Sequence, residues 1–300
     1  HEQSIPAEEL ESYILIDQET GQVLASQDSQ QKLPPASLTK VMTAYVVFDK
    51  LKKGQLKLDD EALVSQKAWK TGGSKTFIEV GKKVKIEDLI QGMIIQSGND
   101  AATALSEHIG GTEEAFAGMM NDYAKDLGME NSHFMNVTGL PMDNHYTTAE
   151  DLGILAKRMI TDFPEYYKYY SMKSFTYNNI TQSSRNRLLF QDPAVDGMKT
   201  GFTNKAGYCY ISSAAKNGRR LVTVVLGAEK PQKRFDDAKI LFAHGFNNYE
   251  THRVIVKNQV IEQLNTNVLK GEKDVVRVGA ANDVLFVAEK NKKEDVSVEG

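Results

Sequence analysis

The sequence predicts an α+β fold in which helices cover an antiparallel β-sheet. Strand-like segments stand at both ends of the first 250 residues, and a long middle stretch repeats its apolar residues at helical spacing. The composition, with 41% hydrophobic and 25% charged residues, is that of a globular protein and excludes a disordered or collagen-like chain. A length of 300 residues favours about two domains.

The first predicted elements are a β-hairpin and a helix. Residues 12–16 and 22–26 are apolar or β-branched runs on either side of a turn-forming stretch that contains Gly21. After Pro34-Pro35 the period changes, which predicts a helix that starts near Ser37. The apolar residues at helical spacing are Leu38, Val41, Met42, Tyr45 and Phe48.

Further helices are predicted over 87–95, 100–108 and 113–127. Another begins at Thr148, whose hydroxyl forms a predicted capping box with Asp151, an Asp in place of the usual Glu or Gln. The chain then becomes strand-like over 174–177, 207–212 and 221–226. Asn217-Gly218 predicts a tight hairpin turn between the last two strands, and a final amphipathic helix is predicted over 233–246.

The last fifty residues lose the helical period. Short strands are predicted over 254–256, 275–278, 284–287 and 296–298, separated by clusters of Asn, Gly and Lys. We therefore expect a main domain over 1–250 and a small β-rich domain over 251–300. Because fifty residues are few for an independent core, we expect this second domain to be truncated.

Composition also excludes several classes of function. A net charge of −4 and a pI near 5.9 leave no basic excess for phosphate contacts, so we expect no nucleic-acid partner. The single cysteine, Cys209, excludes a disulfide framework and a cysteine-rich metal site. No apolar run approaches the ~20 residues of a membrane span. No signal sequence stands at the start, so we expect any secretory signal to have been removed.

The histidines do not predict a metal centre or a histidine-based mechanism. They are scattered, no pair stands at metal-ligand spacing, and the H-E-x-x-H pattern is absent from the sequence. We predict neither a metal nor a cofactor. The six are His1, His108, His133, His145, His244 and His252.

A serine and a lysine provide the better candidate pair. Ser37-Leu38-Thr39-Lys40 places the two side chains three residues apart at a helix start, hence within reach of one another. Free backbone N–H groups at a helix start can also stabilise an oxyanion. The same spacing recurs at Ser29–Lys32 and Ser213–Lys216, which we interpret as solvated polar residues.

Two further motifs accompany this pair. Ser97-Gly98-Asn99 lies between two predicted helices, and Lys199-Thr200-Gly201 lies just before a predicted strand pair. Each has a counterpart that we interpret as an ordinary turn or loop, at Ser184–Asn186 and at Lys70-Thr71-Gly72. The order of the three motifs along the chain is the informative observation, because each motif alone is weak.

The three motifs in this order are the signature of penicillin-binding proteins and class A β-lactamases. The residues around them, 35–43, 96–101 and 195–201, resemble the D-alanyl-D-alanine carboxypeptidases of the type of penicillin-binding proteins five and six, over about residues 12–250. The resemblance implies a penicillin-recognising serine-transferase (β-lactamase/transpeptidase-like) fold with a small β-rich C-terminal domain. It also implies a periplasmic location at the outer face of the inner membrane, with membrane contact only through a C-terminal helix that this sequence lacks.

The resemblance further implies roles for single residues in acyl transfer. Ser37 would attack the carbonyl between the two terminal D-alanines of a peptidoglycan stem pentapeptide, and penicillin would acylate the same serine and inhibit the protein. Lys40 would be the neutral base, with a pKa lowered by burial and by nearby Lys199. Ser97 would protonate the leaving amine, and Asn99 would orient the amide of the acyl chain.

The remaining motif residues would bind the rest of the substrate. Lys199 and Thr200, with Gly201 beside them, would meet the terminal carboxylate, and Arg185 would assist. The segment from Arg185 to Lys199 is one residue shorter than is usual in the family. The backbone N–H groups of Ser37 and Phe202 would form the oxyanion hole, although some relatives carry His where this chain has Phe202.

Two alternative functions stay open at this point. A class A β-lactamase usually shows Ser-Asp-Asn and a Glu-x-x-x-Asn loop. Here the second motif has Gly98, and neither Glu150 nor Glu165 is followed by Asn four residues later. A non-catalytic peptidoglycan-binding or β-lactam-sensing module would not need the intact nucleophile, base and relay motifs.

Overall fold

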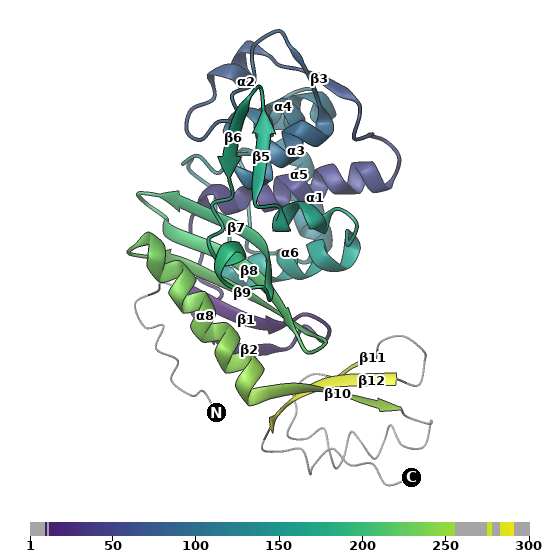
Figure 1. The fold of residues 1–300 in the computed structure, drawn as a ribbon, viewed down its shortest axis with the longest axis vertical. Coiled ribbons are helices and arrows are strands. Elements are labelled where there is room, and N and C mark those ends of the chain that lie inside the picture. The colour runs from purple at the N-terminus through teal and green to yellow at the C-terminus, as the bar shows by residue number, and fades with distance from the viewer. Residues whose placement is uncertain (1–9, 11, 256–274, 278–282, 291–300) are drawn as a thin grey trace.

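The computed structural model describes residues 10, 12–255, 275–277 and 283–290. It confirms the α+β prediction: a five-stranded antiparallel sheet, a helical region next to it, and a small second sheet near the C-terminal end (Figure 1). The strands of the main sheet come from both ends of the main domain, and the helical region is the insert between them.

The main sheet has the strand order β2-β1-β9-β8-β7, and every neighbouring pair is antiparallel. The N-terminal hairpin joins the later strands because β1 pairs with β9 along its whole length. At the opposite edge β7 has one neighbour, β8. The strands are β1 (Ser12–Asp17), β2 (Val23–Gln27), β7 (Val195–Thr203), β8 (Gly207–Lys216) and β9 (Arg219–Ala228).

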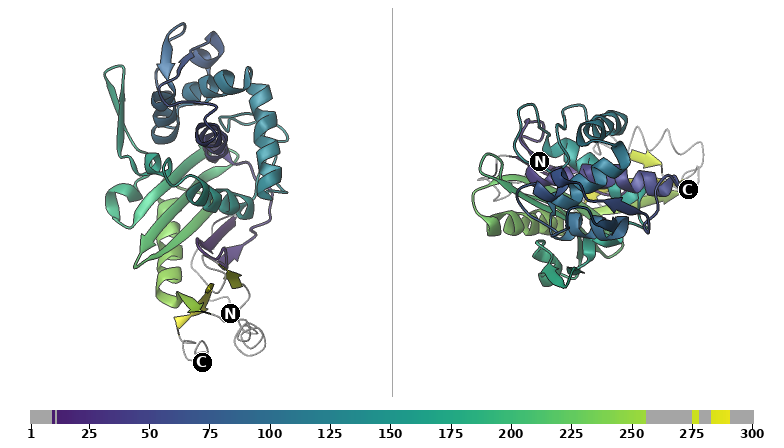
Figure 2. Two further views of the ribbon diagram at one scale, coloured as in Figure 1. Left: turned by 90° about the vertical axis from the view of Figure 1, so that its right-hand side faces the viewer. Right: turned by 90° about the horizontal axis from the view of Figure 1, so that it is seen from above.

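Both faces of this sheet are covered by helices. The long helix α8 (Pro231–Asn248) packs on one face, and α6 (Ala149–Asp162) packs on the other (Figure 2). Alternation along β9 fits this arrangement, since Val222 and Val224 belong to the core on the helical-insert side and Leu221 and Val225 to the core beneath α8.

Helix α1 (Thr39–Lys52) is the central element of the helical region. Eleven of its fourteen residues are buried, because helices contact it on several sides. These neighbours are α3 (Ile86–Ile95), α4 (Asn99–Gly110), α5 (Glu113–Leu127) and α6. The start of α1 is thereby held rigidly at the junction between the helical region and the sheet.

Most predicted elements are confirmed, and the capping box is partly wrong. The hydroxyl of Thr148 accepts a hydrogen bond from the Asp151 backbone N–H at 3.0 Å, as predicted. The Asp151 carboxylate, however, accepts from the backbone of Asn131 and the hydroxyl of Ser132, at 2.9 and 2.7 Å. The Asp151 carboxylate, which was predicted to complete the capping box, therefore holds the preceding loop against α6.

Several short elements and one long strand were not predicted. Lys199-Thr200-Gly201 precedes the pair β8–β9, as predicted, but it lies itself within the unpredicted edge strand β7. Strand β5 (Ser174–Tyr177) was predicted, but its partner β6 (Ile180–Ser183) was not. The other unpredicted elements are the strands β3 (Glu61–Leu63) and β4 (Lys83–Lys85), the helices α2 (Gln66–Lys70) and α7 (Leu188–Gln191), and the 3-10 turns η1 (Ala36–Leu38) and η2 (Tyr167–Ser171).

The second sheet follows directly after α8. Its strands β10 (Tyr249–Ile255), β12 (Asp283–Glu289) and β11 (Val275–Arg277) pair antiparallel in that order. They correspond to three of the four predicted strands, and 296–298 lie outside the described residues. The domain boundary at residue 250 stays a prediction. Within the described residues, no helix combines the length and apolar character needed to span a bilayer.

Candidate active site

The candidate serine lies in the 3-10 turn η1, between the helical region and the sheet. Ala36, just before it, has a left-handed backbone with φ of 51°. The loop at Gly139 packs so closely on this turn that a Cβ there would lie 1.8 Å from the Ala36 carbonyl oxygen. Gly139 also has φ of 89°, so only glycine fits. The position of Ser37 is therefore fixed by tertiary contacts.

Edge strand β7 holds the same turn from the other side. A Cβ on Gly201 would lie 3.0 Å from the backbone nitrogen of Ser37 and 3.1 Å from that of Leu38. The glycine of the third motif thus permits close backbone approach between β7 and the serine. The first and third motifs are at least 159 positions apart along the chain, and they meet at this contact.

Lys40 joins the first and second motifs. Its side chain is 1% exposed, and its Nζ lies 2.9 Å from Ser37 Oγ, 3.0 Å from Ser97 Oγ and 2.9 Å from the Thr138 carbonyl oxygen. A neutral amine has two N–H donors and one lone pair, which matches three partners. In that state Lys40 can donate two hydrogen bonds and accept the proton of a serine.

Burial favours the neutral state of this amine. Desolvation lowers the pKa of Lys40 to about 7, with a further lowering by the charge of Arg185 and an opposing effect of Asp100. Lys199 was the predicted source of the cationic contribution. In the structure Arg185 supplies that part, and Lys40 instead contributes to the lowered pKa of Lys199.

Ser97 lies between the two lysines. Its Oγ is 3.0 Å from Lys40 Nζ and 3.0 Å from Lys199 Nζ, and its backbone has φ of 62°. Lys199 is 3% exposed and also donates to the Thr200 carbonyl at 2.8 Å. Its pKa lies well below the ordinary lysine value because of burial and the charges of Lys40, Arg185 and Arg234. The three hydroxyl- and amine-bearing motifs form one connected network.

The Ser97-Gly98-Asn99 motif is fixed at the start of α4. Asn99 donates its Nδ2 to the Gly72 carbonyl at 2.7 Å, and its buried Oδ1 has no partner within the described chain. Asp100, which sequence reasoning missed, uses its carboxylate to bind a loop beside the site. The donors are the backbone N–H groups of Thr76, Phe77 and Ile78, at 2.8, 3.0 and 3.3 Å.

The face of β7 toward α8 carries the other predicted residues. Thr200 is 5% exposed, whereas Phe202 is exposed and stacks on Tyr208 with ring centroids 4.3 Å apart. Arg234 of α8 was missed. It lies 5.3 Å from the Tyr208 ring centroid and donates to the Gly201 carbonyl at 3.2 Å.

Arg185 is an exposed cation near both active-site lysines. Its positive charge contributes to lowering the pKa of both Lys40 and Lys199. Within the described residues its guanidinium forms neither a hydrogen bond nor an ion pair. Its donors are therefore available to an anionic ligand.

A buried histidine supports the serine turn. His145 Nδ1 accepts from the Met135 backbone N–H at 2.9 Å, so Nε2 carries the proton and donates to Thr39 Oγ1 at 2.8 Å. Burial lowers the pKa of His145 to about 4, which keeps this tautomer neutral. Thr39 lies between Ser37 and Lys40 in the sequence, so His145 stabilises the first motif through its hydrogen bond to Thr39.

The sequence counterparts of the motifs do not converge in this way. The interpretation of Ser213–Lys216 as solvated is wrong for the serine: Ser213 is buried in β8, where its Oγ accepts from Arg220 at 2.8 Å. Lys216 is exposed at the end of the same strand, as predicted. Lys70 is exposed at the end of α2. In the part of the chain that the structure describes, no group of three His, Cys, Asp or Glu side chains could hold a metal ion.

Comparison with known proteins agrees with this geometry. Residues 1–230 match the D-alanyl-D-alanine carboxypeptidase family, and residues 249–299 match the C-terminal domain of penicillin-binding protein 5. The D-alanyl-D-alanine carboxypeptidase DacC of Escherichia coli is 42% identical over 282 residues, which cover 92% of this chain and 70% of that protein. DacF of Bacillus subtilis is 36% identical over 95% of this chain and 74% of its own length.

Solved structures show the same fold. Penicillin-binding protein 5 of Haemophilus influenzae matches with a TM-score of 0.85 and 35% identity, over 98% of this chain and 86% of that one. Penicillin-binding protein 6B of Escherichia coli matches with a TM-score of 0.84 and 34% identity, over 98% and 90%. With a family match over most of its length and the three motifs in one network, the chain belongs to the D-alanyl-D-alanine carboxypeptidase family of serine peptidases.

Proposed function

We propose that this protein is a serine D-Ala-D-Ala carboxypeptidase that removes the terminal D-alanine from peptidoglycan stem pentapeptides through an acyl-enzyme. The observation that supports this most strongly is the position of Lys40 Nζ, about 3 Å from the hydroxyls of both Ser37 and Ser97 in a buried site. A lysine with a pKa of about 7 is a competent general base at neutral pH.

Acylation follows from these contacts. Lys40 accepts the Ser37 proton, and Ser37 Oγ attacks the carbonyl of the penultimate D-alanine. The backbone N–H groups of Ser37 and Phe202 stabilise the oxyanion, a role supported by the close packing of β7 on the serine turn. When the C–N bond breaks, the proton passes from Lys40 through Ser97 Oγ to the amine of the leaving D-alanine.

Hydrolysis of the ester uses the same base. A water molecule gives a proton to Lys40 and attacks the Ser37 ester, and the proton returns to Ser37 Oγ as the ester bond breaks. The shortened peptide is released, and the hydroxyl of Ser37 is regenerated. The unpartnered Oδ1 of Asn99 is the acceptor that we assign to the amide N–H of the acyl chain.

Recognition of a free C-terminal carboxylate distinguishes an exopeptidase from an endopeptidase. We assign this carboxylate to Lys199 and Thr200 of β7 together with Arg185, whose guanidinium is unpaired within the described chain. β-Lactams carry a carboxylate beside a strained carbonyl, so they are expected to acylate Ser37 and inhibit. We place this reaction in the periplasm, where peptidoglycan is the available substrate.

Incubation with a defined pentapeptide ending in D-Ala-D-Ala, followed by assay of free D-alanine, tests the proposal. We expect catalytic release by the wild type and none by Ser37→Ala, while Ser213→Ala should retain wild-type release. Binding of the peptide without release would favour the sensing module. Rapid hydrolysis of penicillin with no release of D-alanine would favour the β-lactamase.

A further inference from the structure

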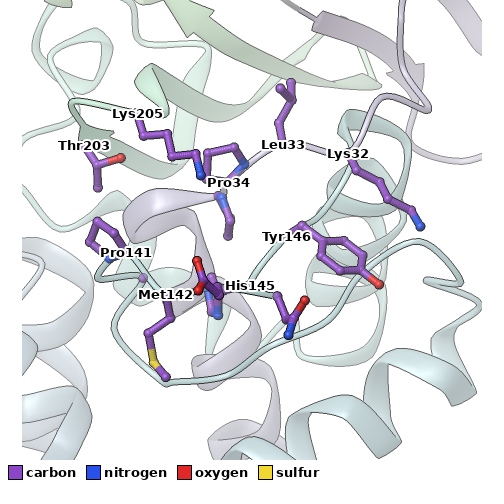
Figure 3. Close-up of a pocket in the computed structure, with 13 residues that line it drawn as sticks. Lys32, Leu33, Pro34, Pro141, Met142, His145, Tyr146, Thr203 and Lys205 are labelled. Atoms are coloured by element: carbon purple, nitrogen blue, oxygen red, sulfur yellow. The ribbon is translucent and has the colours of Figure 1, made fainter.

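A cavity of about 620 Å³ opens beside the serine turn. Figure 3 shows its walls: Thr203 and Lys205 from the end of β7 and the turn after it, Pro34 from the segment before the turn, and Pro141 and Met142 from the loop opposite. Pro35 and Gly139 also line it. Because Gly139 packs directly on the Ala36 carbonyl, the cavity adjoins the reaction centre.

The charges that line this cavity favour an anion. Lys205 is exposed and forms no hydrogen bond or ion pair with the described chain, and in Figure 3 it extends toward Pro34. Lys32 lies on the opposite side, with its Nζ 4.9 Å from the Tyr146 ring centroid. Asp143 is the single carboxylate in the lining, and His145 is neutral because burial lowers its pKa to about 4.

The direction of the substrate brings its acyl part to this cavity. With the terminal carboxylate at Lys199 and Thr200, the rest of the peptide must continue past Gly201 toward Thr203 along the open edge of β7. An extended chain rises about 3.3 Å per residue, so Thr203 lies about 7 Å beyond Gly201. Gly201 abuts Ser37, where the penultimate D-alanine would react. A residue two positions before that D-alanine would therefore reach the cavity.

We propose that this cavity is a subsite for the acyl part of the substrate, in which Lys205 binds a carboxylate carried two residues before the penultimate D-alanine. This inference rests on the proposed function, which fixes the direction of the peptide. The apolar walls at Pro34, Pro141 and Met142 pack against the backbone of the bound segment. Because Lys205 is exposed, the effect is modest and sensitive to salt.

Two matched peptides test this subsite: acetyl-Glu-Ala-D-Ala-D-Ala and acetyl-Gln-Ala-D-Ala-D-Ala, which differ only in the charge of one side chain. For the wild type we expect kcat/KM to be about three- to fivefold higher for the Glu peptide, mainly through KM. Lys205→Met should abolish the preference, and Lys205→Arg should retain it. Lys216→Met, which removes an exposed lysine outside the cavity, is the matched control and should also retain it.

The outcomes separate the subsite from the proposed function. Equal kcat/KM for both peptides with the wild type, or an undiminished preference in Lys205→Met, would overturn the subsite while D-alanine release still supports the carboxypeptidase. Failure of the wild type to release D-alanine from either peptide would overturn the proposed function and the subsite with it. Loss of the preference at high salt in the wild type, Lys205→Arg and Lys216→Met would support the assigned charge pair.

Discussion

Ser37–Lys40 and Ser213–Lys216 share one spacing but differ completely in structure. In the first, a 3-10 turn leads into α1, and Lys40 Nζ lies 2.9 Å from Ser37 Oγ. In the second, both residues lie in β8, where side chains three positions apart point to opposite faces. Spacing predicts contact only within a helical turn.

The burial of the lysine and the partner of the serine separate the two pairs further. Lys40 is 1% exposed, and its pKa falls to about 7, whereas Lys216 is exposed to solvent. The hydroxyl of Ser213 is already engaged by Arg220. A reactive pair therefore requires a desolvated amine and a hydroxyl that no other cation holds, and sequence spacing shows neither property.

Replacing the lysine of each pair by arginine gives the largest expected contrast. Lys40→Arg should slow penicillin acylation about a thousandfold or more, because guanidinium cannot act as a base at neutral pH. Lys216→Arg should leave the rate unchanged. Intact mass spectrometry of timed penicillin reactions measures both, and a melting curve establishes that the variants fold. Near-normal acylation of a folded Lys40→Arg protein would require another base.

Arg185 tests whether an exposed cation near this pair contributes to binding. Loss of a charged hydrogen bond worth roughly 1.5–3 kcal/mol predicts about a 10- to 150-fold fall in kcat/KM for Arg185→Ala on a D-Ala-D-Ala peptide. The loss should be far smaller on the same peptide with an amidated C-terminus. The two substrates and two proteins close a double-mutant cycle. Equal losses of kcat/KM on both peptides would show that Arg185 supports the fold and does not bind the substrate carboxylate.

The glycine of each Lys-Thr-Gly sequence offers a smaller test. Gly201→Ala places a Cβ 3.0 Å from the Ser37 backbone nitrogen and must displace β7 or the turn, so we expect about a tenfold fall in the acylation rate. Gly72→Ala meets nothing within 4 Å and should leave the rate unchanged. Acylation of Gly201→Ala at the wild-type rate would show that the close packing is dispensable.

Much of the fold was predictable because its signals are local. Helical periodicity located α3, α4 and α5, and Asn217-Gly218 located the β8–β9 turn, where φ is 54° and 76°. β7 escaped because its sequence, interrupted by Gly197 and Gly201, lacks strand alternation. Its strand conformation depends on pairing with β8.

In the candidate site, too, residues in contiguous motifs were predictable, whereas residues that act through contacts between distant segments were not. Serine, lysine and asparagine motifs were found because each is contiguous, and their roles stay predictions. Arg234, His145 and Asp100 were missed since each acts through a contact with a distant segment: Gly201, Thr39 and Phe77 respectively. The cavity beside the turn was not predictable, because its lining comes from three separate stretches of the chain.

The pH dependence of penicillin acylation tests the central claim most directly, namely that a buried neutral Lys40 activates Ser37. Since the neutral amine is the reactive form, the acylation rate should rise with pH through an apparent pKa near 7 and then level off. Stopped-flow measurement between pH 5 and 11, with the adduct mapped to Ser37, provides the profile. A rise centred near the ~10.4 of free lysine, or a rate independent of pH, would contradict the account.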